Sequence, residues 1–117
     1  MKELLRLADE AVPFAFGTSV VCAIQAHEHD DELSRRMWPH VRDKALRIGC
    51  AAASLALDIG YSKEQAVKIV YKAAMRCNIS EVVNKKQHKL LAKRYAKQAC
   101  WIALKTIRSW EAQIEDE

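Results

Sequence analysis

The sequence predicts an all-α fold, a compact bundle of five or six helices in one domain covering residues 1–117. Glycine and proline, which break helices, occur only three and two times in the chain. No stretch shows the sustained alternation of β-branched and aromatic residues that is typical of strands, so we expect no sheet. The run from Ile48 to Leu57 carries no charge and indicates a buried helix. We expect this central helix to span about residues 40–58.

Two apolar stripes at helical spacing run through the central segment. One stripe contains Val41, Ala45, Ile48, Ala52, Leu55 and Ile59, and the other contains Leu46, Cys50, Ala53 and Leu57. A surface helix needs only one such stripe, so a helix with two is covered on both sides. The many small residues here predict that neighbouring helices approach closely.

Two shorter helices are expected before the central one. The first covers Lys2–Ala11, and its inward residues are Leu4, Leu5, Ala8 and either Ala11 or Val12. Pro13 should end it, because the residue before a proline avoids helical geometry. The second begins near Pro13 or Thr18, with an inner stripe of Cys22, Ala26, His29, Leu33 and Met37. It either runs to Trp38 or breaks at Asp30–Asp31, and Pro39 then lies in the first turn of the central helix.

Capping residues mark the helices that follow. Gly60 is placed to close the central helix in the left-handed conformation. Ser62 and Gln65 match a capping box, which begins a helix that ends near Cys77. The inner face of that helix contains Ala66, Ile69 or Val70, Ala73 and Cys77. Asn78 can end it, and Ser80 can cap the next helix.

The last helix is the longest. It begins at Glu81 or after a kink at residues 84–86, and it runs to about Ile114. From residue 86 its length would be about 43 Å, which is long for a chain of this size. Its end would therefore project or pair with another chain, and a homodimer is possible. The inner stripe consists of Ala92, Ala96, Ala99, Ala103, Ile107, Trp110 and Ile114.

Cysteine spacing and the N-terminal sequence favour the cytoplasm. The four cysteines lie far apart and are Cys22, Cys50, Cys77 and Cys100. This spacing favours reduced thiols used as small core residues over a disulfide scaffold. The longest uncharged run, Ala11–Ala26, is too short to span a bilayer and is interrupted by Pro13. Acidic residues occupy the place of a basic leader, so we expect no signal peptide and no membrane partner.

Positive charge is concentrated in the second half of the chain. The net charge is +4, but residues 1–61 hold 7 Lys and Arg against 9 Asp and Glu, whereas residues 62–117 hold 12 against 6. No acidic residue lies between Val82 and Trp110. The last helix therefore offers a long stretch of cations without an acidic neighbour in the sequence.

These cations recur at helical spacing. Along the last helix they advance by three or four residues, with one double step that skips Trp101, and they are Lys86, Lys89, Lys93, Lys97, Lys105 and Arg108. A second stripe on the preceding helix consists of Lys68, Lys72 and Arg76. The two stripes could merge if the helices are antiparallel neighbours. Aligned cations suit nucleic acid, because each neutralised phosphate releases counterions, and Trp101 could stack on an exposed base.

We therefore expect a non-enzymatic protein that binds DNA or RNA through a basic helix face. The main alternative is a small accessory or inhibitory module that binds an acidic protein surface. A solvated helix face would also explain the lysines, as would a contact with the acidic region Glu28–Glu32 of the same molecule or of a second copy. Trp101 could equally be buried.

Other functional motifs are weak. Residues 73–83 loosely match a helix-turn-helix with its turn at Asn78–Ser80, but Asn84 stands where an apolar residue belongs. The His27–Glu32 cluster places only two metal-binding side chains on one helix face, and two ligands do not make a site. The sequence contains no nucleophile elbow or glycine-rich phosphate loop. We therefore expect no catalytic residues, metal or cofactor.

Overall fold

Four helices make up the part of the chain that the computed structural model describes, which is the backbone of residues 2–115 and the side chains of residues 2–106. The first helix runs without a break through α1 (Lys2–Arg6), η1 (Leu7–Ala11) and α2 (Val12–His27). The others are α3 (Glu32–Ile59), α4 (Lys63–Met75) and α5 (Lys85–Glu115). The all-α prediction is confirmed, but the expected number of five or six helices is wrong.

Pro13 does not end the first helix, contrary to our expectation. Just before the proline, η1 forms a wide turn in which the Val12 N–H donates to the carbonyl of Leu7, five residues back. Proline has no N–H to donate, and its ring presses on the carbonyl four residues earlier in a regular helix. We attribute the continuous helix to this wider turn, which relieves the conflict. Leu4 is buried as predicted, but Leu5 is exposed.

The first helix is also strongly apolar. From Lys2 to His27 it is long and apolar enough to cross a membrane, a property that core helices of soluble proteins and N-terminal signal sequences share. We judged the uncharged run Ala11–Ala26 too short for this, but the helix that contains it extends beyond both of its ends. Here its inner side, including Val12 and Phe16, is buried in the core.

The chain turns between α2 and α3, at the break that the sequence left open. Asp30 has a positive φ of 54°, and the Asp31 carboxylate caps α3 by accepting from the Ser34 N–H (2.9 Å) and hydroxyl (2.6 Å). These two hydrogen bonds lower the pKa of Asp31. Because the chain reverses here, the expected inner stripe does not continue, and His29, Leu33 and Met37 are exposed.

Helix α3 occupies the centre of the fold, as predicted, and packs against α2, α4 and α5. It begins well before Pro39, so placing that proline in the first turn was wrong. The two apolar stripes are buried or half-buried except for Ile59. Gly49 is buried under Tyr95 of α5, whose hydroxyl donates to the Ala45 carbonyl. Small residues therefore allow the close approach that the sequence suggested.

The cap that closes α3 and the capping box that begins α4 agree with the sequence. Gly60 adopts a φ of 112°, and Ser62 and Gln65 form the predicted capping box. The expected end of α4 at Asn78 is wrong, because α4 ends at Met75 with Arg76 as its C-cap, and the start of α5 also differs. The expected Ser80 cap is wrong, because α5 begins later and Asn84 caps it by accepting from the Gln87 N–H at 2.8 Å. Residues 76–84 are too many for the three- or four-residue turn of a helix-turn-helix, which excludes that motif.

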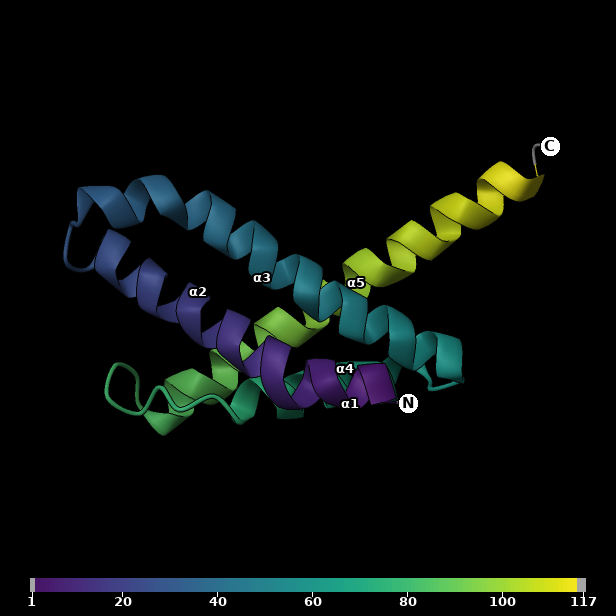
Figure 1. The fold of residues 1–117 in the computed structure, drawn as a ribbon, viewed down its shortest axis with the longest axis horizontal. Helices are drawn as coiled ribbons and strands as arrows, with labels where there is room; N and C mark the ends of the chain where they lie inside the picture. Colours follow the sequence, from purple (N-terminus) through teal and green to yellow (C-terminus); the bar gives the residue numbers. More distant parts are fainter. Residues whose placement is uncertain (1, 116–117) are drawn as a thin grey trace.

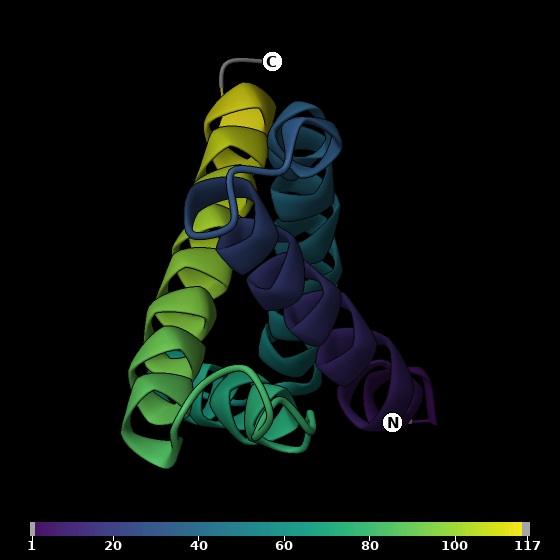
Figure 2. The ribbon, with the colours of Figure 1, turned by 90° about the vertical axis from the view of Figure 1, so that its left-hand side faces the viewer.

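Helices α4 and α5 are antiparallel neighbours. The Lys63 carbonyl at the start of α4 lies 3.9 Å from the Cys100 Sγ, while the Ala74 carbonyl at its end lies 3.1 Å from the His88 Nε2. Figure 1 shows α5 crossing α3 and extending away from the other helices, and the molecule measures 50 × 26 × 22 Å. Figure 2 shows that α2 and α5 diverge on one side of α3.

Candidate functional site

The lysine stripe of α5 lies on its solvent side. The exposed lysines are Lys86, Lys89, Lys93, Lys97 and Lys105, and the buried stripe of the same helix consists of Ala92, Ala96, Ala99 and Ala103. The buried alanines hold α5 against the bundle, so the lysines face water. Within residues 2–106, none of these lysines forms an ion pair. The side chain of Arg108, the last predicted member, lies outside the described residues.

Trp101 interrupts the stripe as an exposed ring, so the alternative of a buried indole is wrong. Trp101 is 59% exposed, although leaving a large apolar side chain in water costs free energy. The Lys105 Nζ lies 5.0 Å from the ring centroid, within range of a cation–π interaction. A flat aromatic surface flanked by ammonium groups is the combination found in single-strand binding sites.

In the second predicted stripe, on α4, one of the three cations is already held in an ion pair. Lys68 and Lys72 are exposed and form no ion pair within residues 2–106. Arg76 instead donates to the Asp9 carboxylate at 2.7 Å and to the Ala8 carbonyl at 3.3 Å. That contact lies on the side of α4 that faces η1, so Arg76 is already neutralised. Lys72 lies four residues before Arg76 on the same side of α4, away from the side that contacts α5, so the contacts do not bring the α4 stripe together with the α5 lysines.

Arg94 is a further cation of this surface that the sequence prediction did not include. It is exposed, and at seven residues before Trp101 it lies almost in line with the indole on the same side of α5. This spacing is visible in the sequence, but the predicted stripe contained Lys93 and not its neighbour Arg94. We call the surface formed by Lys86, Lys89, Lys93, Arg94, Lys97, Trp101 and Lys105 the basic face.

A groove adjoins the basic face between the diverging helices of Figure 2. It has a volume of about 640 Å³. It is lined by residues of α2 and α5, by Trp38 and Leu46 among others from α3, and by Val82 from the segment before α5. Arg42 and Arg94 add positive charge to this mainly apolar lining, with Glu28 as its acidic member. The groove could not be predicted from the sequence, because it depends on the angle between two helices.

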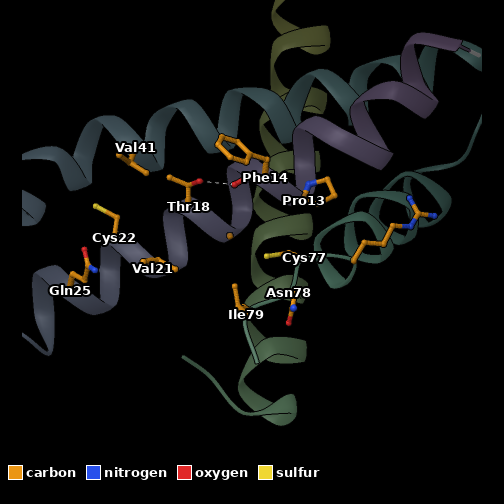
Figure 3. Close-up of a pocket in the computed structure, with 12 residues that line it drawn as sticks. Pro13, Phe14, Thr18, Val21, Cys22, Gln25, Val41, Cys77, Asn78 and Ile79 are labelled. Carbon is orange, nitrogen blue, oxygen red and sulfur yellow. Dashed lines mark hydrogen bonds between the residues drawn. The ribbon is translucent and has the colours of Figure 1, made fainter. Parts of the chain in front are cut away.

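A second hollow, of about 660 Å³, lies on the other side of α2, where it meets residues 76–79 (Figure 3). Gly17 leaves space for Cys77, because a Cβ at this position would lie 2.5 Å from the Cys77 Sγ. The Thr18 hydroxyl donates a hydrogen bond to the Phe14 carbonyl at 2.8 Å. The side chains of Gln25 and Asn78 accept hydrogen bonds from Ser34 and Ser80, so this hollow offers few free polar groups.

Buried titratable groups serve packing rather than reactivity. Burial raises the pKa of the Tyr95 hydroxyl and of the Cys77 and Cys100 thiols, which keeps all three protonated at neutral pH. The four cysteines are free thiols, of which Cys100 is fully buried and the others are half-buried. Among the described residues, no group of three or more potential metal ligands comes together.

Comparison of the chain with protein-family models, with curated proteins and with solved structures found no match. The basic face and the groove are therefore the features from which a function can be inferred.

Proposed function

We propose that the basic face binds nucleic acid and that the protein works by binding rather than by catalysis. The observation that carries this proposal is a contrast between lysines and arginines. Every ion pair among the described residues uses an arginine, namely Arg35, Arg36, Arg47 and Arg76. The lysines of the basic face are left to water and are free to contact phosphates. Binding would release counterions from the nucleic acid, which is favourable at low salt.

The exposed Trp101 favours a single strand over a duplex. In a duplex the bases are already stacked, whereas in a single strand a base can lie on the indole, which contributes about 1–3 kcal/mol. The acidic Glu28–Glu32 region is a weaker explanation for the lysines. Asp30 and Glu32 are paired with Arg35 and Arg36, at 3.3 and 2.9 Å, within the same turn and helix.

Charge reversal at the centre of the basic face tests the proposal. We expect the triple variant Lys89→Glu, Lys93→Glu and Lys97→Glu to bind labelled single-stranded DNA and RNA at least about tenfold more weakly at low salt. If each lysine contacts one phosphate, the slope of log affinity against log salt should fall by about 2 in magnitude. Fluorescence anisotropy over a series of salt concentrations measures both quantities.

The matched control reverses three exposed cations away from this surface, Lys2→Glu, Arg6→Glu and Lys44→Glu. It changes the net charge equally and should retain more of the affinity. In the same titration, Trp101→Leu should weaken binding to a single strand and leave duplex binding nearly unchanged. Wild-type affinity that is independent of salt, or equal loss in both triple variants, would refute a specific basic face.

The groove supports a second candidate function, binding of an acidic amphipathic helix from a partner protein. Its apolar lining fits the nonpolar side of such a helix, and Arg42 and Arg94 fit the acidic side. The lysines reversed above do not line the groove. An acidic peptide that binds wild type and the triple lysine variant equally, without competition from nucleic acid, would favour this function over the first.

A further inference from the structure

The groove between α2 and α5 combines an apolar lining with the size of a small-molecule site. Its volume of about 640 Å³ lies within the range of about 300–1,000 Å³ that such sites have. The buried and half-buried apolar residues that line it come from α2, α3 and α5 and include Phe16, Ile24, Trp38, Leu46, Leu91 and Tyr95. An apolar body placed in the groove would therefore contact side chains of three helices.

Two arginines give this apolar groove a positive charge. Arg42 of α3 and Arg94 of α5 both line it and are exposed, whereas Phe16 and Tyr95 are buried. The charged side chains therefore lie nearer to solvent than the aromatic rings. Glu28, the C-cap of α2, is the acidic member of the lining, so two positive charges stand against one negative charge. Within residues 2–106, neither Arg42 nor Arg94 forms an ion pair, whereas four other arginines do.

This arrangement suits a ligand that has an anionic group at one end and an apolar body. A guanidinium can hold a carboxylate through two parallel N–H donors, which the ammonium group of a lysine cannot do. The attraction is stronger beside apolar side chains than in open water, because the charges are less screened there. The Tyr95 hydroxyl already donates to the Ala45 carbonyl, so Tyr95 offers the ligand its ring.

We propose that the groove binds a small carboxylate with an apolar body, whose anionic group lies on Arg42 and Arg94 and whose body lies against the apolar lining. The size of the groove favours this ligand over a partner helix. A helix with its side chains is about 10–12 Å wide, so two turns of it occupy roughly 850–1,200 Å³. Only part of a helix would therefore fit into the groove, whereas a small molecule would enter it whole.

The proposal goes beyond nucleic-acid binding and is tested without nucleic acid, by isothermal titration calorimetry with decanoate and octanoate as monomers. Burying one CH₂ group strengthens binding about fourfold, so the two additional CH₂ groups of decanoate should tighten binding about tenfold. The neutral analogue 1-octanol has the chain length of octanoate without its charge. It should bind at least about tenfold more weakly than octanoate, because it cannot pair with the arginines.

The double variant Arg42→Met with Arg94→Met tests the charged part of the groove. Methionine keeps an apolar chain and removes the guanidinium, so the affinity for decanoate should fall at least about tenfold. The affinity for 1-octanol should stay near the wild-type value. The matched control, Arg36→Met with Arg47→Met, removes two exposed arginines of α3 that do not line the groove and should leave both affinities unchanged.

Filling the groove tests the apolar part. Ala23→Phe adds a ring to the lining and should weaken decanoate binding, whereas Thr18→Phe adds one on the other side of α2 and should not. Circular dichroism checks that both variants keep their helix content. Absence of decanoate binding at millimolar concentration, or equal losses in the two double variants, would overturn the proposal. An acidic helical peptide that binds in the groove where decanoate does not would assign the groove to a partner helix instead.

Discussion

At Gly49, helix α3 lies so close to α5 that no side chain fits. A Cβ there would lie 2.6 Å from the Tyr95 Oη, 2.8 Å from its Cζ and 3.0 Å from the Ala99 Cβ. The Tyr95 ring cannot easily move away, because it also packs against Phe16 and its hydroxyl donates a hydrogen bond to the Ala45 carbonyl. The glycine therefore sets the distance between these helices, despite its low helix propensity.

We expect Gly49→Ala to lower the free energy of unfolding by about 2 kcal/mol, because overpacking outweighs the gain of about 1 kcal/mol in helix propensity. Urea denaturation measures this change. The control Ala51→Gly, at an exposed position of the same helix, reports the propensity difference alone. A Gly49→Ala variant as stable as wild type would show that α3 and α5 can separate without loss.

For individual residues, the sequence predicted which side chains are exposed better than it predicted which residues they contact. The exposure of the α5 lysines follows from helical spacing, because they all fall outside the stripe of buried alanines. The ion pair of Arg76 with Asp9 joins residues far apart in the chain, so spacing along one helix could not reveal it. Arg94, by contrast, could have been found from its spacing to Trp101.

Among the elements, helix starts were predictable where two local signals agree. Ser62 and Gln65 bond reciprocally, at 3.2 and 2.8 Å, as the capping-box pattern predicts. Ser80 offers only a hydroxyl, which donates to the Asn78 side chain at 3.0 Å, while Asn84 and Gln87 form the reciprocal pair at the start of α5. Proline was the least reliable signal, since helices continue through both Pro13 and Pro39.

These caps make a prediction about individual elements. Ser62→Ala and Asn84→Ala should each lower the free energy of unfolding by about 1 kcal/mol, because each leaves a helix N–H without its acceptor. Ser80→Ala should have a much smaller effect, because its hydroxyl caps no helix. Thermal and urea denaturation of the three single variants check the order. Equal losses at all three positions would contradict the assignment of Asn84 as the cap.

For the whole molecule, the angle between the helices could not be predicted from the sequence. The pattern of apolar residues predicted the buried sides of α3, α4 and α5, and therefore the bundle, but not that of α2, where Val12, Phe16 and Val20 are buried. It could not show that α2 and α5 diverge, because that depends on how side chains from three helices fill the centre. Phe16 of α2 spans the gap, with its ring centroid 5.8 Å from that of His88 and 5.3 Å from that of Tyr95.

We therefore expect Phe16, together with the contact of α3 with Tyr95, to hold the α2–α3 pair and the α4–α5 pair together as one cooperative unit. Phe16→Ala should lower the free energy of unfolding by about 3–5 kcal/mol, because it leaves a cavity where the helices diverge. Phe14→Ala is the matched control on the same helix, since Phe14 is 77% exposed and its loss should be nearly neutral. Urea unfolding followed by both far-ultraviolet circular dichroism and tryptophan fluorescence measures the stability and the cooperativity. If Phe16→Ala costs no more than Phe14→Ala, other contacts must join the two helix pairs, and the groove between α2 and α5 would not depend on this ring.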